Sequence, residues 1–88
     1  MTTEARRIRY TPGARRDLRR MDPPIRRRIV LAIERLAADD PRADVRRLKG
    51  SDELRLRVGE WRVRFRRDDA AREIVVSRVL PRGRVYDR

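Results

Sequence analysis

Hydrophobic and charged residues alternate along residues 53–66, on both sides of Gly59-Glu60. A period of two is typical of a β-strand with one buried face. A two-residue Gly-X connection favours a type II′ turn, so the two halves of this segment are expected to form a hairpin. That register places three apolar pairs on the buried face: Val58 with Trp61, Leu56 with Val63, and Leu54 with Phe65.

The opposite face of this hairpin is expected to carry arginines. Arg57 would lie across from Arg62, and Arg55 across from Arg64. Like charges that face each other destabilise a sheet by roughly a few tenths of a kcal/mol or more, and residues that break such a local rule tend to lie at functional sites. A guanidinium cluster is a good receptor for phosphate. The alternative is a solvated basic surface without a specific ligand.

Two helix-start signals precede the hairpin. Thr11-Pro12 and Asp22-Pro23 each combine an N-cap residue with proline at the first helical position. Apolar residues at helical spacing follow each signal. They are Ala14, Leu18 and Met21 in the first predicted helix, and Ile25, Ile29, Ala32, Ile33 and Leu36 in the second.

The remaining segments complete a small sheet. Residues 6–10 are expected to form a short strand, residues 42–47 a polar connection, and residues 73–80 a strand. The apolar run Ile74-Val75-Val76 predicts that this last strand is central and covered on both faces. The order strand–helix–helix–strand–strand–strand predicts one α+β domain over residues 1–88. Its two N-terminal helices would pack on one face of a small antiparallel sheet of about four strands.

The charge of the chain predicts a polyanionic partner. The 88 residues include 26 Lys and Arg against 14 Asp and Glu, which gives a net charge of +12. Nucleic acid, an acidic protein and an anionic membrane surface would all be attracted. The run Arg26-Arg27-Arg28 at the start of the second helix fits either a solvated face or a flank for RNA or an acidic partner.

The absence of two residue types limits the chemistry. There is no cysteine, which excludes disulfides and the usual zinc sites, and no histidine, the commonest acid–base group and metal ligand. We therefore expect no metal and no cofactor. The sequence also has no apolar run typical of a signal peptide or a membrane span, so we expect a cytoplasmic protein.

Several short motifs occur in order along the second half of the chain. They are Leu48-Lys49-Gly50, Gly59-Glu60-Trp61-Arg62-Val63, the Val-rich strand, and Arg82 followed by Val85-Tyr86. Together with the preceding strand and helical hairpin, this set resembles the RelE/ParE toxins of bacterial toxin–antitoxin operons. The resemblance extends from about Ile8 to Tyr86.

The resemblance implies a function, partners and site residues. RelE-type toxins are ribosome-dependent endoribonucleases that cut mRNA, and the positions implied as catalytic are Arg55, Arg57, Arg62, Arg82 and Tyr86. Further RNA contacts are expected from Lys49, Arg64 and Arg84. The implied partners are an acidic antitoxin protein and the ribosome with its mRNA and rRNA, without a membrane or a small-molecule cofactor.

Two other functions are compatible with the same fold. ParE-type toxins poison DNA gyrase and usually lack this full basic-plus-Tyr set, so its presence favours the RelE type. An inactive relative that only binds an antitoxin or RNA is a third possibility. A short neighbouring gene for an acidic protein would support either toxin.

RNA cleavage by its own 2′-OH needs a base, an acid and stabilisation of the charged intermediate. Arginines provide the stabilisation, but their high pKa prevents proton transfer. Glu53 and Glu60 are candidate bases, or else ion-pair partners of the arginines. Tyr86 is a candidate proton donor or base-stacking group, or else an edge of the core. Trp61 faces the core in the predicted register, which indicates a structural role.

Overall fold

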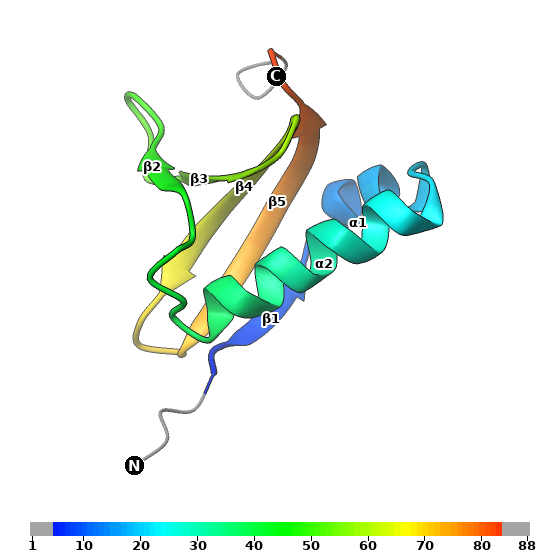
Figure 1. The fold of residues 1–88 in the computed structure, drawn as a ribbon. Coiled ribbons are helices and arrows are strands. Elements are labelled where there is room, and N and C mark those ends of the chain that lie inside the picture. Colours follow the sequence, from blue (N-terminus) through cyan, green and yellow to red (C-terminus); the bar gives the residue numbers. More distant parts are fainter. Residues whose placement is uncertain (1–4, 84–88) are drawn as a thin grey trace.

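The computed structural model describes residues 5–83 and shows two helices against one face of a curved sheet (Figure 1). The sheet has five strands in the order β1-β5-β4-β3-β2, and the predicted α+β class is confirmed. The elements are β1 (Arg7–Tyr10), α1 (Pro12–Arg19), α2 (Pro23–Ala37), β2 (Val45–Arg47), β3 (Leu54–Val58), β4 (Trp61–Asp68) and β5 (Glu73–Pro81).

The sheet differs from the prediction in two ways. It has five strands where about four were expected, and it is not wholly antiparallel, because β1 pairs with β5 in parallel. The additional strand is β2, which lies within the predicted polar connection of residues 42–47 and pairs with β3. Three residues are too few for a periodic signal, and β2 depends on the free edge that β3 offers.

Both helices begin where the sequence predicts. Thr11 has an extended backbone, and its Oγ accepts a hydrogen bond from the backbone N–H of Ala14 at 3.2 Å. Asp22 occupies the same position before α2, but its side chain forms no capping hydrogen bond. The start of α2 therefore depends on the proline after the cap and on burial of the helix.

The hairpin has the predicted register. Val58 pairs with Trp61, Leu56 with Val63, and Leu54 with Phe65. Gly59 has a φ of 58°, whereas Glu60 does not adopt a positive φ. A positive φ at only the first central position is the requirement of the predicted type II′ turn.

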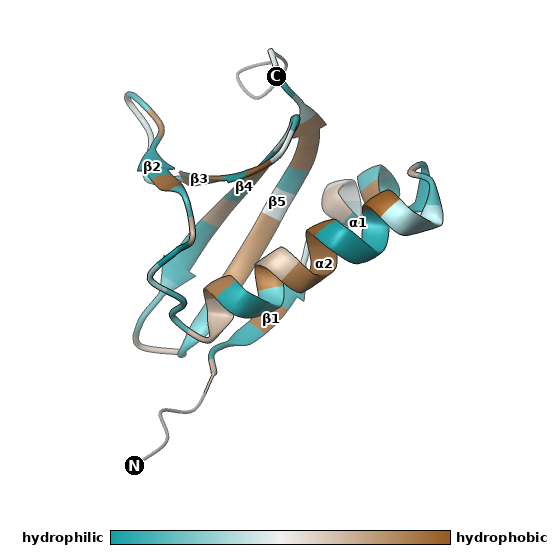
Figure 2. Ribbon diagram, in the orientation of Figure 1, coloured by the Kyte–Doolittle hydropathy of each residue, from teal (hydrophilic) through white to brown (hydrophobic). Residues whose placement is uncertain are grey.

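The core lies between the helices and the inner face of the sheet. Apolar bands run along α2 and β5 (Figure 2). The apolar residues predicted to meet here belong to one cluster, and five of them are partly buried at its margin: Ile25, Ala32, Leu54, Val58 and Trp61. The buried members of the predicted set are Ala14, Leu18, Met21, Ile29, Ile33, Leu36, Leu56, Val63, Phe65 and Val76.

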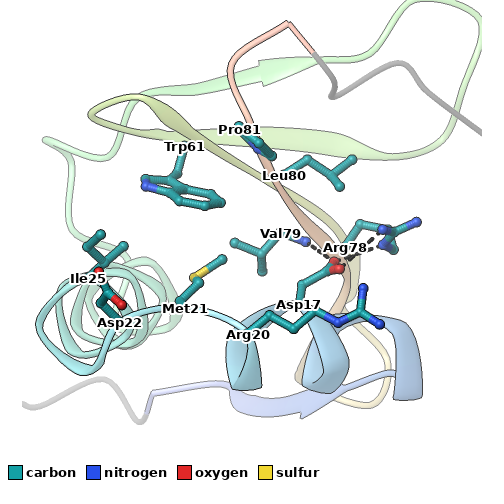
Figure 3. A pocket seen from close by; sticks show the side chains of 10 residues that line it. All are labelled: Asp17, Arg20, Met21, Asp22, Ile25, Trp61, Arg78, Val79, Leu80 and Pro81. Atoms are coloured by element: carbon teal, nitrogen blue, oxygen red, sulfur yellow. Dashed lines mark hydrogen bonds and ion pairs between the residues drawn. The ribbon is translucent and has the colours of Figure 1, made fainter.

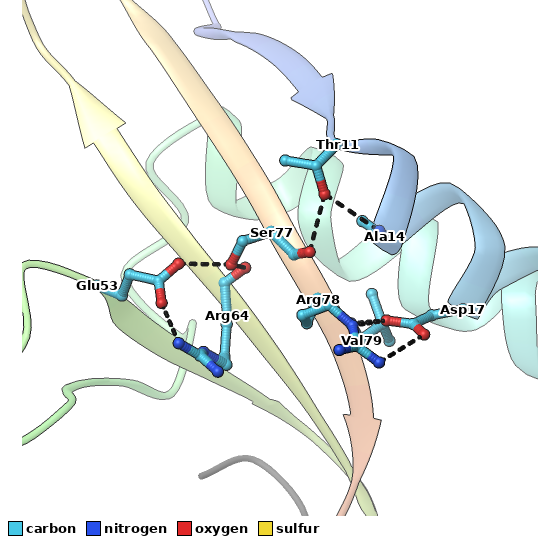
Figure 4. Close-up of polar contacts among 8 residues, drawn as sticks. All are labelled: Thr11, Ala14, Asp17, Glu53, Arg64, Ser77, Arg78 and Val79. Atoms are coloured by element: carbon cyan, nitrogen blue, oxygen red, sulfur yellow. Dashed lines mark hydrogen bonds and ion pairs between the residues drawn. The ribbon is translucent and has the colours of Figure 1, made fainter. Parts of the chain in front are cut away.

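Strand β5 is interior, as predicted, and its run Ile74-Val75-Val76 is buried. Its pairing with β1 ends at Val76, and α1 protects the edge beyond that point (Figure 4). The Thr11 hydroxyl donates to Ser77 O at 2.8 Å, and the Asp17 carboxylate accepts from the backbone N–H of Val79 at 2.8 Å. The side chains of Thr11 and Asp17 thus form hydrogen bonds with the β5 backbone where β1 no longer pairs with it.

Candidate functional site

Four arginines of the β3–β4 hairpin lie on the face opposite to the core residues. Arg57 pairs with Arg62, and Arg55 pairs with Arg64, as the alternation predicted. Arg57 is exposed, and Arg55 and Arg64 are half-buried. Arg62 is only 7% exposed, so the face is less open than predicted at this position.

Arg62 is held by the turn of its own hairpin. Its Nη1 donates to Gly59 O at 2.9 Å and to Trp61 O at 3.0 Å. Burial lowers the pKa of Arg62, and the positive charges of Arg55, Arg57 and Arg82 lower it further, against the opposite effect of Glu60. A bound anion would relieve this repulsion.

Arg82 joins the hairpin arginines through the backbone. It follows β5, and its N–H donates to Glu60 O at 2.7 Å, which ties this segment to the β3–β4 turn. Its side chain is exposed. Four of the residues predicted as catalytic are therefore brought together, and we call Arg55, Arg57, Arg62 and Arg82 the arginine cluster. Their catalytic role stays a prediction.

Glu53 is an ion-pair partner at the edge of this face (Figure 4). Its carboxylate accepts hydrogen bonds from Arg64 Nη2 and from the Ser77 hydroxyl. A register shift between Arg64 and Phe65 leaves Ser77 outside the regular β4–β5 pairing. Burial alone would raise the pKa of Glu53, but the hydrogen bonds from Ser77 and Arg64 outweigh it and lower the pKa. Of the two roles considered for Glu53, this geometry favours the ion pair.

The other predicted site residues are not all assembled here. Lys49 is exposed in the β2–β3 connection, with no ion pair to any residue between 5 and 83. Arg84 and Tyr86 lie outside the described residues. Trp61 packs against the core, as predicted.

Two structural features near the site escaped the sequence prediction. Arg46 pairs with Arg55 and extends the arginine face onto β2. Asp17 binds Arg78, with 2.8 Å between its Oδ2 and Arg78 Nε, and this contact raises the pKa of Arg78. Asp17 and Arg78 are 61 residues apart, and β2 is only three residues long, so no local pattern indicates either feature.

A cavity of about 390 Å³, whose lining includes no residue of the arginine cluster, lies between the α1–α2 turn and the end of β5 (Figure 3). Apolar side chains, among them Met21, Ile25 and Trp61, form most of its lining, and the Asp17–Arg78 pair lies at its margin. The described residues hold no group of acidic side chains suited to a metal ion. Neither described helix is long and apolar enough to cross a membrane.

A family model described as "ParE toxin of type II toxin-antitoxin system, parDE" matches residues 8–86. The chain belongs to the ParE toxin family. The resemblance to RelE/ParE toxins is confirmed, and this ParE-family protein is a toxin of a type II toxin–antitoxin system. No curated protein matches the sequence.

Solved structures that resemble this ParE-family toxin include complexes of RelE toxins with their antitoxins. The RelBE2 toxin–antitoxin complex of Mycobacterium tuberculosis matches with 27% identity and a TM-score of 0.74, over 90% of this chain and 100% of that chain. The RelB–RelE complex of Methanococcus jannaschii matches with 28% identity and a TM-score of 0.70, over 90% and 95%. The archaeal RelE–RelB complex from Pyrococcus horikoshii has the same fold, with 24% identity, a TM-score of 0.74 and coverage of 93% and 100%.

Proposed function

We propose that this toxin is a ribosome-dependent endoribonuclease that cleaves mRNA. The observation that carries the proposal is the arginine cluster, in which a nearly buried Arg62 is surrounded by three further cations. Preorganised donors stabilise negative charge that develops in a transition state, and loss of one such donor typically costs about 10²–10³ in rate. The cluster supplies such donors for a phosphate.

The reaction follows from the chemistry of RNA. The 2′-oxygen attacks the adjacent phosphorus, the new O2′–P bond forms, and the bond from phosphorus to the 5′-oxygen breaks. The products are a 2′,3′-cyclic phosphate and a free 5′-hydroxyl. Arg62 and Arg82 would bind the non-bridging oxygens, which carry the greatest charge in the pentavalent intermediate. The proton of the 2′-OH leaves to a base, and the 5′-oxygen takes up a proton.

Proton transfer needs groups other than the arginines, because a guanidinium keeps its proton at neutral pH. The ion-paired Glu53 would be a weak base. Alignment of the 2′-OH with the leaving oxygen lowers the barrier by several kcal/mol, and we propose that the ribosome imposes this geometry. Tyr86 is the proposed proton donor or stacking group. This dependence on the ribosome implies a cytoplasmic site of action.

A second candidate function is the poisoning of DNA gyrase. The observation in its favour is the family model, which describes ParE toxins. In that case the arginine cluster would bind an acidic surface or DNA without cutting a phosphodiester. An inactive relative that only binds its antitoxin would inhibit neither target.

We further propose an acidic antitoxin as the partner. The similar solved structures with 27% and 28% identity are both toxin–antitoxin complexes, RelBE2 and RelB–RelE. A net charge of +12 favours association with an acidic chain. A neighbouring gene for a short acidic protein would support this pairing.

The proposal is tested by primer extension on cellular mRNA after induction of the toxin. Cuts in frame with codons, in mRNA that is being translated, are the expected result. Double-strand breaks in DNA together with intact mRNA would support gyrase poisoning instead. Growth without either lesion would indicate an inactive binding protein.

A further inference from the structure

A row of four arginines crosses the sheet at right angles to the strands. Arg46 on β2 pairs with Arg55 on β3, Arg55 with Arg64 on β4, and Arg64 with Arg78 on β5. Neighbouring strands lie about 4.8 Å apart, so the row spans about 14 Å. This length exceeds what a single phosphate needs.

The two ends of the row differ in their ion pairs. Arg64 binds Glu53, and Arg78 binds Asp17. At the other end, Arg46 and Arg55 form no ion pair with any residue in the described part of the chain. Positive charge without a partner therefore continues from the arginine cluster toward the edge strand β2, while carboxylates neutralise the row toward α1.

Arg55 also has a side-chain donor that a bound anion could use. Its Nε is buried and has no hydrogen-bond partner among residues 5–83. Leaving a buried donor unpaired is unfavourable, and an anion bound between Arg55 and Arg46 would draw this guanidinium into new hydrogen bonds.

We infer that an RNA strand leaves the arginine cluster over β3 and continues along Arg55 to Arg46 at the β2 edge. This inference rests on the proposed function for the choice of RNA. Regularly spaced guanidiniums suit the phosphates of an extended nucleic-acid strand.

The binding test uses a short single-stranded RNA with 2′-O-methyl groups, which cannot be cleaved by its own 2′-oxygen. Arg46→Gln is compared with Arg47→Gln by fluorescence anisotropy over a series of salt concentrations. Both arginines are exposed and adjacent on β2, but Arg47 pairs with Leu54 on the opposite face. We expect Arg46→Gln to weaken binding several-fold and to reduce the slope of log K against log salt by about 0.7, the value for one phosphate contact on a single strand. Arg47→Gln should change the RNA affinity and the salt slope only by the small effect of losing one positive charge.

A crosslinking test locates the path directly. The chain has no cysteine, so Arg46→Cys, Arg47→Cys and Arg20→Cys each provide one attachment point for a photo-crosslinker. Arg20 lies beside Asp17 and Arg78, at the opposite end of the row (Figure 3). RNA is expected to crosslink from position 46 in clear excess over positions 47 and 20.

Equal effects of the Arg46 and Arg47 substitutions, or stronger crosslinking from position 20, would overturn the inference. Binding of poly-glutamate that depends on Arg46, with RNA binding that does not, would assign the row to an acidic protein instead. Because the RNA used is not cleaved, the result is independent of catalysis. If cellular mRNA stays intact while RNA binding depends on Arg46, only the proposed function is rejected. If mRNA is cut in frame with codons but RNA binding does not depend on Arg46, only the RNA path over β2 is rejected.

Discussion

The carboxylate of Glu53 accepts a hydrogen bond from the guanidinium of Arg64 on the neighbouring strand of the sheet. The same carboxylate accepts a hydrogen bond from the Ser77 hydroxyl, so it is bound from β4 and from β5. One carboxylate, just before β3, therefore contacts both β4 and β5 beside the arginine cluster. This contact is a source of stability, and its pH dependence can be measured.

We expect Glu53→Gln to lower the free energy of unfolding at pH 7 by about 1–2 kcal/mol, because a charge-assisted hydrogen bond is lost. The pKa of Glu53 is lowered in the folded state. Its contribution is thus complete above the ordinary value of 4.5 and is lost as the pH falls through the lower folded value. Urea unfolding at pH 7 and pH 3 should show a smaller difference from wild type at pH 3 than at pH 7. Glu60→Gln, in the exposed turn, is the control, and a Glu53→Gln effect of the same size at both pH values would contradict this account.

Replacing Arg82 by alanine should separate catalysis from binding. If Arg82 stabilises the transition state, mRNA cleavage falls about 10²–10³-fold. Ribosome binding is retained, because the remaining cations still supply the salt-dependent attraction to RNA. Arg62→Lys is the companion variant, since it retains the charge of a buried side chain but removes its fixed donor geometry. Arg27→Ala, on the exposed side of α2, is the control. Near wild-type cleavage by both Arg82→Ala and Arg62→Lys would leave the cluster as an anion-binding surface only.

Tyr86→Phe distinguishes the two proposed roles of this tyrosine. If the hydroxyl transfers a proton, cleavage should fall about 10²–10⁴-fold. If the tyrosine ring stacks on a base, the phenylalanine ring can stack in the same way, and cleavage changes little. Tyr86→Ala removes both functions and serves as the reference. Single-turnover cleavage on programmed ribosomes measures the difference.

The packing of α2 is tested by two positions on the same helix. Ile29 and Ile33 are fully buried, whereas Leu31 is 46% exposed. We expect Ile29→Ala or Ile33→Ala to cost about 2–5 kcal/mol, which is a large part of the stability of a domain of this size. Leu31→Ala should cost less than about 0.5 kcal/mol. Unfolding midpoints that are equal for the three variants would mean that the buried face of α2 is assigned wrongly.

Asp17 should stabilise the edge of β5 that β1 leaves uncovered. Asp17→Ala leaves the backbone N–H of Val79 without its 2.8 Å acceptor, which should cost about 1–3 kcal/mol. Its partner Arg78 is 39% exposed and adds little to this figure. Asp22→Ala is a matched control, because Asp22 starts the next helix without a side-chain cap. Hydrogen exchange at the Val79 amide should accelerate only in Asp17→Ala, and unchanged exchange there would contradict the role of Asp17.

The sequence alone determined the features that depend on neighbouring residues. The alternation around Gly59-Glu60 set the hairpin register, because side chains alternate between the two faces of a strand. Thr11-Pro12 and Asp22-Pro23 marked both helix starts, because a cap and a fixed proline φ act within one turn. From these two features followed the core face and the position of four arginines on the opposite side.

The tertiary structure decided every feature that joins distant segments. Strand β2 exists because β3 offers an edge, and β1 runs parallel to β5 because the helical hairpin returns the chain across the sheet. The backbone N–H of Arg82 donates to the carbonyl of Glu60, which holds Arg82 near the β3–β4 turn and Arg62. Asp17 and Glu53 form ion pairs with Arg78 and Arg64 at one end of the arginine row. These contacts have no local signature, because hydrogen bonds and ion pairs between remote residues form only when folding has placed both partners. The hairpin arginines and their cross-strand register were therefore predictable from the sequence, whereas their ion pairs and the burial of Arg62 were not.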